Sequence, residues 1–230
     1  LNPSSAASDV YKRQGDMDYF KFTLEEDRII NVVVDSISRN LDFGMDLLDR
    51  EGFDIKYKIT QDGSNITLGY FLAAGDYYIS FKDIYSIGSS DLPMVFSVND
   101  YIVDKNENNN TWETSTEISL GDTITGTLFP SEDLDLFKIE IKDTVSTLKF
   151  EFNSLPTVEN TYFRLYDSGK NKVIAQSIRT DSYSTSRELF PGIYYASIEL
   201  GLAKSSEKIY NFVVTEEEAE AVVTMDDVVK

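Results

Sequence analysis

The sequence contains neither cysteine nor histidine. This absence excludes Ser-His-Asp triads, thiol nucleophiles, disulfide bonds and the usual zinc sites. The metal ligands that remain are the hard oxygens of carboxylates and amides, which suit calcium and, less tightly, magnesium. We therefore expect no catalytic residues and no enzymatic activity in this chain.

Basic residues are also scarce. The 21 Lys and Arg residues stand against 40 Asp and Glu residues, for a formal net charge of -19. A chain this acidic repels phosphate backbones and anionic membrane surfaces. No run approaches the roughly 18 to 20 consecutive apolar residues of a membrane-spanning helix. Hydrophobic residues nevertheless make up 41% of the chain, too many for a disordered acidic polypeptide. We expect folded, monomeric protein that binds neither nucleic acid nor membrane.

The first fourteen residues, LNPSSAASDVYKRQ, differ in character from the rest. They contain no initiating Met, no apolar segment and no periodicity, so they predict neither a signal peptide nor a strand. The string DVYKRQ resembles the translated end of a transposon adapter. We expect residues 1–14 to be an artefact or disordered and the true N-terminus to be missing, so a missing signal peptide does not argue against secretion.

An internal repeat organises the remainder of the chain. The strings GDMDYFKF and EDLDLFKI correspond at an offset of 117 residues, the difference between positions 16 and 133. The same offset relates Gly75, Tyr77, Tyr78 and Ser80 to Gly192, Tyr194, Tyr195 and Ser197. A period this long exceeds the roughly 20 to 50 residues of solenoid repeats and matches a whole sandwich domain of about 100 residues.

The repeat and the composition predict the domain boundaries. We expect a first domain over residues 15–100, truncated at its N-terminus, and a second over residues 113–215. Asn-rich residues 101–112 would be the linker. Residues 216–230 would be an acidic tail or the start of another linker.

Alternating apolar residues predict strands within each domain. Phe20, Phe22 and Leu24 share one face of residues 19–24, and residues 136–141 repeat the pattern. Other predicted strands of the second domain are residues 123–128, 147–153, 162–166, 173–178, 192–199 and 210–215. Because no helical stripe longer than two turns occurs, we predict an all-β fold of two tandem antiparallel, jelly-roll-like β-sandwiches.

Paired aspartates stand at the entry to the same strand in both domains. Asp133 and Asp135 share the parity of Phe137, so both carboxylates should face the side that becomes the core. Close like charges raise one pKa unless a cation neutralises them. A D-x-D spacing by itself is common, and two solvated strand-entry residues are an equally good interpretation.

Residues 106–215 resemble the bacterial pre-peptidase C-terminal (PPC) domain, a module found behind secreted peptidases. The matching strings are NENNNTWETSTEISLG, DLDLFKI, LYDSGKN and GIYY. Asn108 stands where the family has Pro, and Ser115 where it has Ala; neither is an expected ligand. Relatives include collagen-binding modules of clostridial collagenases. The resemblance implies a secreted or cell-surface, non-catalytic module.

The resemblance also implies a calcium site, because relatives hold Ca²⁺ between linker acids and amides and the strand-entry aspartates. Carried over residue by residue, the expected ligands are Glu107, Asn109, Asn110, Asp133 and Asp135. The first domain keeps Asp16 and Asp18 but lacks a matching linker. We therefore expect its site to be weaker and incomplete.

Two tyrosines are candidates for ligand binding. Tyr194 should face the core, which leaves Tyr195 on the outer face, and Tyr78 has the same position in the first domain. Exposed aromatic rings on a sheet can stack on sugars or pack on a fibrous protein. Cross-strand pairing of strand-forming residues is the plainer interpretation.

These observations lead to one function and one alternative. The chain is expected to be a non-catalytic, calcium-stabilised accessory module of a secreted bacterial peptidase. It would either bind a substrate or matrix, such as a fibrous protein or polysaccharide, or act as a spacer. The alternative is an adhesin or surface-stalk module that binds glycan or protein.

Overall fold

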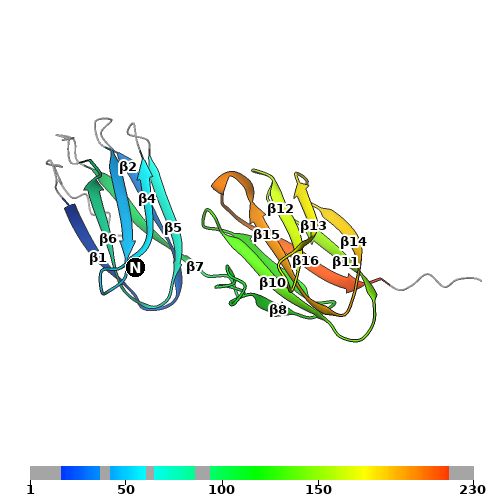
Figure 1. Ribbon diagram of the computed structural model, residues 1–230. Helices are drawn as coiled ribbons and strands as arrows, with labels where there is room; N and C mark the ends of the chain where they lie inside the picture. Colours follow the sequence, from blue (N-terminus) through cyan, green and yellow to red (C-terminus); the bar gives the residue numbers. More distant parts are fainter. Residues whose placement is uncertain (1–16, 37–41, 61–64, 86–93, 218–230) are drawn as a thin grey trace, which may run out of the picture. The chain divides into compact units, whose positions relative to one another are not determined.

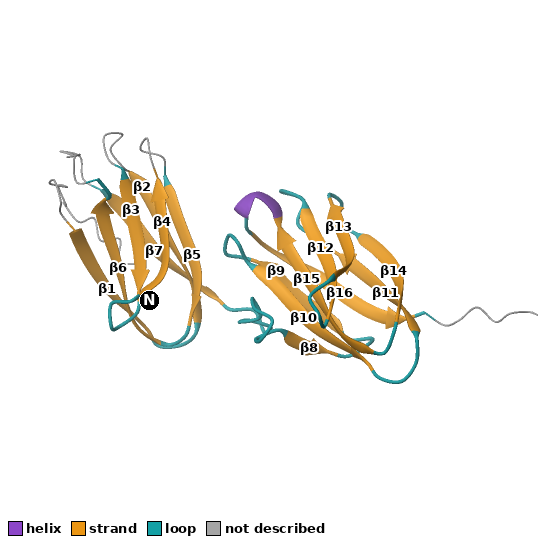
Figure 2. Ribbon diagram, viewed as in Figure 1, coloured by secondary structure: helices purple, strands orange, loops and turns teal. Residues whose placement is uncertain are grey.

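The computed structural model describes residues 17–36, 42–60, 65–85 and 94–217. The predictions for residues 1–14 and for Asp16 lie outside these ranges, as does most of the predicted tail. The described chain is almost entirely β-strand, with one short 3₁₀ turn, η1 (Gly201–Ala203) (Figure 2). Within these ranges no helix is long and apolar enough to span a membrane. The all-β prediction is confirmed.

The chain divides into two compact units, Leu1–Asp104 and Lys105–Lys230 (Figure 1). In the first unit one sheet has the strand order β1-β6-β3-β4 and the other the order β5-β2-β7. The strands are β1 (Met17–Leu24), β2 (Arg28–Ser36), β3 (Phe43–Leu48), β4 (Asp54–Thr60), β5 (Ile66–Leu72), β6 (Gly75–Asp83) and β7 (Val95–Ile102). All pairs between them are antiparallel.

The second unit is also a two-sheet sandwich, with the orders β13-β12-β15-β10-β8 and β14-β11-β16-β9. Its first five strands are β8 (Thr116–Ile118), β9 (Thr123–Leu128), β10 (Leu134–Ile141), β11 (Ser146–Asn153) and β12 (Thr161–Asp167). The others are β13 (Lys172–Ile178), β14 (Tyr183–Leu189), β15 (Gly192–Leu200) and β16 (Ser206–Glu216).

The two units repeat the same strand order and register. Phe20 pairs with Ile79 in the first unit, and Phe137 pairs with Ala196 in the second, both displaced by 117 residues. The β3–β4 and β12–β13 hairpins even share a register shift, at Leu48 and Tyr166. A chance match of short strings would not reproduce eight successive cross-strand pairs, so the repeat predicted from the sequence is confirmed.

The second unit has two strands without a counterpart among the described residues of the first. β8 pairs in parallel with the outer edge of β10, and β9 pairs with the outer edge of β16. Within the described ranges, no strand pairs with the corresponding edges of β1 and β7. Among the described residues, the two units therefore differ at these two edges.

The core of each unit lies between its sheets, as the alternation predicts. In β10 the side chains of Asp135, Phe137, Ile139 and Ile141 are buried, whereas Glu140 is exposed. β14 escaped prediction because Tyr183–Leu189 (YSTSREL) has only one fully buried residue. An edge strand that is polar on both faces has no period-two signal.

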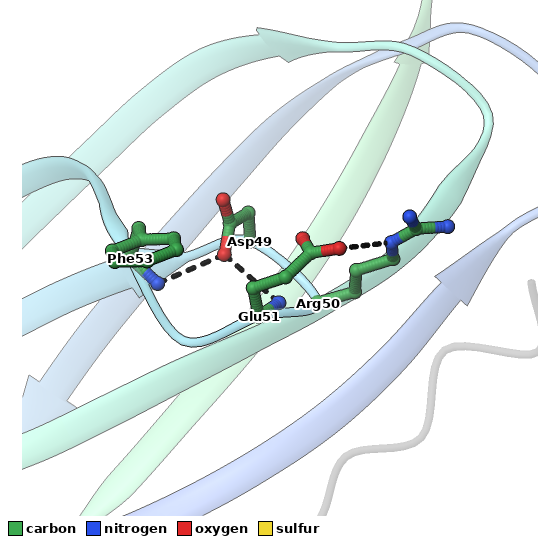
Figure 3. Close-up of polar contacts among 4 residues, drawn as sticks. All are labelled: Asp49, Arg50, Glu51 and Phe53. Atoms are coloured by element: carbon green, nitrogen blue, oxygen red, sulfur yellow. Dashed lines mark hydrogen bonds and ion pairs between the residues drawn. The ribbon is translucent and has the colours of Figure 1, made fainter.

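An aspartate shapes the same turn in both units. Asp49 Oδ1 accepts hydrogen bonds from the backbone N–H of Glu51 at 3.0 Å and of Phe53 at 2.8 Å (Figure 3). Asp167 Oδ1 likewise accepts a hydrogen bond from the backbone N–H of Asn171 at 2.9 Å. Hydrogen bonding from Asn171 lowers the pKa of Asp167. The two turns therefore have the same local structure, which Asp167 and Asn171 form in the second unit and Asp49 and Phe53 form in the first.

Candidate metal centre

Asp135 is the centre of the candidate site. It is the second residue of β10 and is fully buried, because its side chain points to the same face as Phe137. Its Oδ1 accepts a hydrogen bond from Asn109 Nδ2 at 2.9 Å, and its Oδ2 accepts one from Tyr210 Oη at 2.6 Å. Two charge-assisted hydrogen bonds hold this carboxylate where burial alone would disfavour its charge.

Two more carboxylates lie beside Asp135. One oxygen each of Asp104, Glu107 and Asp135 lies within 4.8 Å of the other two. Asp104 and Glu107 belong to the segment of residues 103–115 that joins β7 to β8. Three carboxylates this close repel one another unless a cation neutralises them. Sequence reasoning missed Asp104, although an acid three residues before Glu107 was a usable signal.

Asn109 supplies the second observation that points to a cation. Its side chain is fully buried, and its Oδ1 has no hydrogen-bond partner. A buried amide oxygen without a partner costs roughly 1–3 kcal/mol. The same side chain donates from its Nδ2 to Asp135, and the Asn109 backbone N–H lies 3.4 Å from Glu107 Oε2, so Asn109 adjoins two of the three carboxylates. Three carboxylates and an amide oxygen match the ligands that Ca²⁺ prefers, so the residues present fit calcium.

The connecting segment is anchored to β10 by its backbone and amides. The backbone N–H of Leu136 donates to the Asn109 carbonyl at 3.2 Å, and that of Leu134 donates to Asn110 Oδ1 at 3.0 Å. Asn110 Nδ2 reaches Glu107 Oε2 at 3.5 Å. The Asn110 side chain therefore lies beside the Glu107 carboxylate, and its Oδ1 accepts a hydrogen bond from the first residue of β10.

Asp133 makes a contact with the loop that precedes β10. It lies just before β10, and its Oδ2 accepts a hydrogen bond from the backbone N–H of Phe129 at 2.9 Å. The group of three carboxylates contains Asp135 and not Asp133. The structure therefore brings together Glu107, Asn109 and Asp135, and it gives Asp133 a turn-closing contact.

In the first unit, Asp18 has the register position of Asp135. Asp18 pairs with Phe81, as Asp135 pairs with Ile198. Asp18 is half-buried, whereas Asp135 is fully buried. Asp16 lies outside the described residues, so the incomplete site predicted for the first unit stays a prediction.

The two candidate tyrosines, predicted to be exposed on the outer face, are half-buried. The Tyr195 ring packs edge-on against Trp112, with a centroid distance of 5.0 Å, and Tyr166 packs against the same indole at 5.2 Å. Lys170 Nζ lies 5.0 Å from the Trp112 centroid. Strand parity placed Tyr195 on the outer face, but it did not reveal that the connecting segment covers part of that face.

Gly126 leads to a prediction at the site. A Cβ at this position would lie 2.7 Å from Tyr210 Oη and 2.9 Å from Tyr210 Cζ. Gly126→Ala should therefore displace the tyrosine that donates to Asp135 and destabilise the second unit by about 1–3 kcal/mol. Thermal unfolding followed by Trp112 fluorescence measures this, because Trp112 is the only tryptophan. Tyr210→Phe, which loses only the hydroxyl, should cost less; an unchanged midpoint for Gly126→Ala would contradict the clash.

Comparisons with known proteins gave matches among solved structures alone; no family model and no curated protein matched. The structural neighbours include the pre-peptidase C-terminal domain of a collagenase from Bacillus anthracis, at 14% identity and a TM-score of 0.39, covering 44% of this chain and 94% of that one. The tandem CBM51 modules of a family 98 glycoside hydrolase from Streptococcus pneumoniae match at 6% identity and a TM-score of 0.29, covering 88% and 82%. The secreted serine protease VesC from Vibrio cholerae matches at 10% identity and a TM-score of 0.32, and the match covers 90% of this chain and 48% of that one.

Proposed function

We propose that this chain is a non-catalytic accessory segment of a secreted bacterial peptidase and that calcium stabilises it. Its role would be to bind a fibrous protein or polysaccharide, or to act as a spacer. The observation that carries the calcium part is the buried, unpartnered Oδ1 of Asn109, whose Nδ2 donates to Asp135 in the group of Asp104, Glu107 and Asp135. The resemblance of residues 106–215 to PPC domains supports the accessory role.

The proposed cation has a structural role. Asp135 belongs to β10, whereas the other three donors belong to the connecting segment. A Ca²⁺ ion bound by both would fasten the segment to the sheet and offset the repulsion among the carboxylates. Asn110 and Asp133 remain proposed ligands. They accept hydrogen bonds from the backbone of Leu134 and Phe129, which would hold the strand entry beside the ion.

The chemistry of the donor set favours binding over catalysis. Asp135 has both oxygens engaged in hydrogen bonds and is inaccessible to solvent. A general acid or base must reach its substrate within hydrogen-bond distance, directly or through one water molecule. A carboxylate buried beneath the connecting segment suits a stabilising ion better than a substrate.

Matrix binding is tested by retention of the purified chain on insoluble collagen, chitin and cellulose. We expect retention on at least one matrix, and we expect Tyr195→Ala and Tyr78→Ala to weaken it because each removes aromatic contact area from an outer sheet face. Phe190→Ala, a change at an exposed ring between β14 and β15, is the matched control. Casein and chromogenic glycosides should not be hydrolysed.

Two results would contradict parts of the proposal. Retention on no matrix would contradict binding and leave the spacing role. Turnover of casein that is lost on one carboxylate substitution would contradict the non-catalytic assignment. The alternative, an adhesin or surface-stalk module, shares the binding result and differs in the polypeptide that adjoins these units.

A further inference from the structure

A hollow of about 460 Å³ lies at one end of the first unit. The fold brings three segments together around it: the end of β1, the turn between β3 and β4, and the start of β6. The volume is within the ~300–1,000 Å³ that is usual for small-molecule sites. The polar side chains that line the hollow are Thr23, Asp49, Arg50, Glu51, Asp76 and Tyr77.

Each charged side chain of the β3–β4 turn is held by one atom and keeps another atom unbonded. Asp49 Oδ1 accepts from two backbone N–H groups, and Glu51 Oε1 accepts from Arg50 Nε at 2.5 Å (Figure 3). From the described residues, no hydrogen bond reaches Asp49 Oδ2, Glu51 Oε2 or the terminal nitrogens of Arg50. Hydrogen-bonding groups that are already ordered bind a ligand at a smaller entropic cost.

Asp76, the second residue of β6, is held by β1. Its Oδ2 accepts a hydrogen bond from Lys21 Nζ at 2.8 Å, and its Oδ1 accepts one from Thr23 Oγ1 at 2.6 Å. These hydrogen bonds lower the pKa of Asp76, so its carboxylate is ionised at neutral pH. The carboxylates of Asp76 and Glu51 therefore already have basic partners, which a cationic ligand would have to displace.

The lining disfavours several other classes of ligand. It carries three carboxylates and one guanidinium, so it repels phosphate and other anions. Within the described ranges, the only three carboxylates grouped closely enough for a metal ion are those of Asp104, Glu107 and Asp135. A neutral hydroxyl group both donates and accepts hydrogen bonds. The neighbouring hydroxyls of a sugar ring therefore match this mixture of acceptors and donors.

The second unit keeps the scaffold around this position but not the charged groups. Tyr77 Oη donates to the Ala73 carbonyl at 2.9 Å, and Tyr194 Oη donates to the Phe190 carbonyl at 3.0 Å. At the register positions of the charged residues Arg50, Glu51 and Asp76, the second unit has Ser168, Gly169 and Ile193. The fold therefore does not require the charged groups, which are a feature of the first unit.

We propose that the hollow is a binding site for a neutral sugar residue of a polysaccharide, in which Asp49 and Glu51 accept hydrogen bonds from neighbouring hydroxyls and Arg50 donates to them. The half-buried ring of Tyr77, which stacks on Phe22 at a centroid distance of 5.7 Å, would contact the C–H groups of the sugar.

The inference deepens the proposed binding role and rests on it, because the hollow adjoins one of the two candidate tyrosines. Side chains alternate along a strand, so Asp76 and Tyr78 of β6 share a face. A polysaccharide that enters the hollow would therefore run on towards Tyr78.

Binding of soluble tetrasaccharides to the full chain tests the proposal. Saturation-transfer NMR and calorimetry are run with neutral tetrasaccharides of glucose, N-acetylglucosamine, mannose, galactose and xylose, and with acidic tetragalacturonate. We expect at least one neutral tetrasaccharide to bind and tetragalacturonate not to bind. Arg50→Ala should raise the dissociation constant about tenfold or more, as expected for the loss of one hydrogen bond to a charged group. Arg187→Ala, at an exposed arginine of β14, is the matched control and should bind like the unchanged chain.

The Arg50 side chain is 76% exposed, so Arg50→Ala should keep the unfolding midpoint measured by circular dichroism, which separates lost binding from lost folding. Binding of none of the neutral tetrasaccharides, or equal binding by Arg50→Ala, would overturn the site. Binding of tetragalacturonate alone would overturn the assignment to a neutral sugar.

The proposed function and this inference can fail separately. Retention on an insoluble matrix that Arg50→Ala leaves unchanged, with no tetrasaccharide bound, would keep the proposed binding role and overturn the hollow as its site. Tetrasaccharide binding that Arg50→Ala weakens, without retention on any matrix, would support the hollow and contradict matrix binding.

Discussion

Calcium is expected to raise the thermal midpoint of the second unit by about 10 °C. Binding to the folded state alone contributes about 2.7 kcal/mol when free calcium is about 100 times its dissociation constant. For a unit of this size each kcal/mol shifts the midpoint by roughly 4 °C. Trp112 lies in the second unit and is the only tryptophan, so its fluorescence follows this unit during unfolding of the full chain.

Carboxylate substitutions should remove the calcium effect. Glu107→Gln keeps the size of the side chain and an oxygen that can accept from the Asn109 and Asn110 N–H groups, so it should fold and yet lose most of the shift. Asp135→Asn should lose it as well, with a lower midpoint in chelator because a buried hydrogen-bond arrangement changes. Asp143→Asn, at an exposed carboxylate, is the control and should keep the full shift.

The calcium hypothesis fails if the midpoint is indifferent to both millimolar calcium and chelator. Asp133→Asn then distinguishes two roles of that residue. A variant that unfolds at a lower temperature but keeps its calcium shift would confine Asp133 to the turn contact with Phe129. A variant without the shift would place Asp133 among the ligands.

Phe212→Ala should destabilise the second unit by about 3–5 kcal/mol, the usual cost of truncating a buried Phe. The Phe212 ring is fully buried in the centre of the core. Its centroid lies 4.8 Å from that of Phe152, 5.7 Å from Phe137 and 6.3 Å from Phe163. The cavity left by the missing ring would therefore weaken the packing of both sheets of the second unit. Trp112 fluorescence should report a midpoint lower by more than about 10 °C.

Phe190→Ala provides the matched control for this change. Phe190 lies between β14 and β15 and is exposed, and its backbone carbonyl, which accepts from Tyr194 Oη at 3.0 Å, is unaffected by the substitution. We expect a midpoint shift of less than about 2 °C. Equal losses for the two variants would show that the aromatic cluster is not the source of the stability.

The repeat and its strands could be predicted because both are local in the sequence. The parity of Phe137, Ile139 and Ile141 predicted the buried face of β10, and Asp135 follows it because side chains alternate along any strand. The matched strings at an offset of 117 predicted the shared register for the same reason. An edge strand such as β14 lacks that alternation and could not be found in this way.

The membership of the candidate site could be predicted only in part. Glu107, Asn109 and Asp135 were identified from a family pattern, yet their grouping with Asp104 and the hydrogen bond from Tyr210 depend on residues up to 75 positions apart. Spacing along the chain cannot show which oxygens meet when a connecting segment folds back on a strand.

The sequence by itself determined the two-unit all-β architecture, the buried face of each main strand and the acidic, oxygen-rich ligand chemistry, because alternation and composition act over a few neighbouring residues. The tertiary structure alone decided that the connecting segment lies on β10, that Asn109 is buried without a partner for its Oδ1, and that Tyr195 is half-covered by Trp112. Those features arise from contacts between distant parts of the chain. Tertiary packing determines these features, and no local sequence pattern encodes that packing.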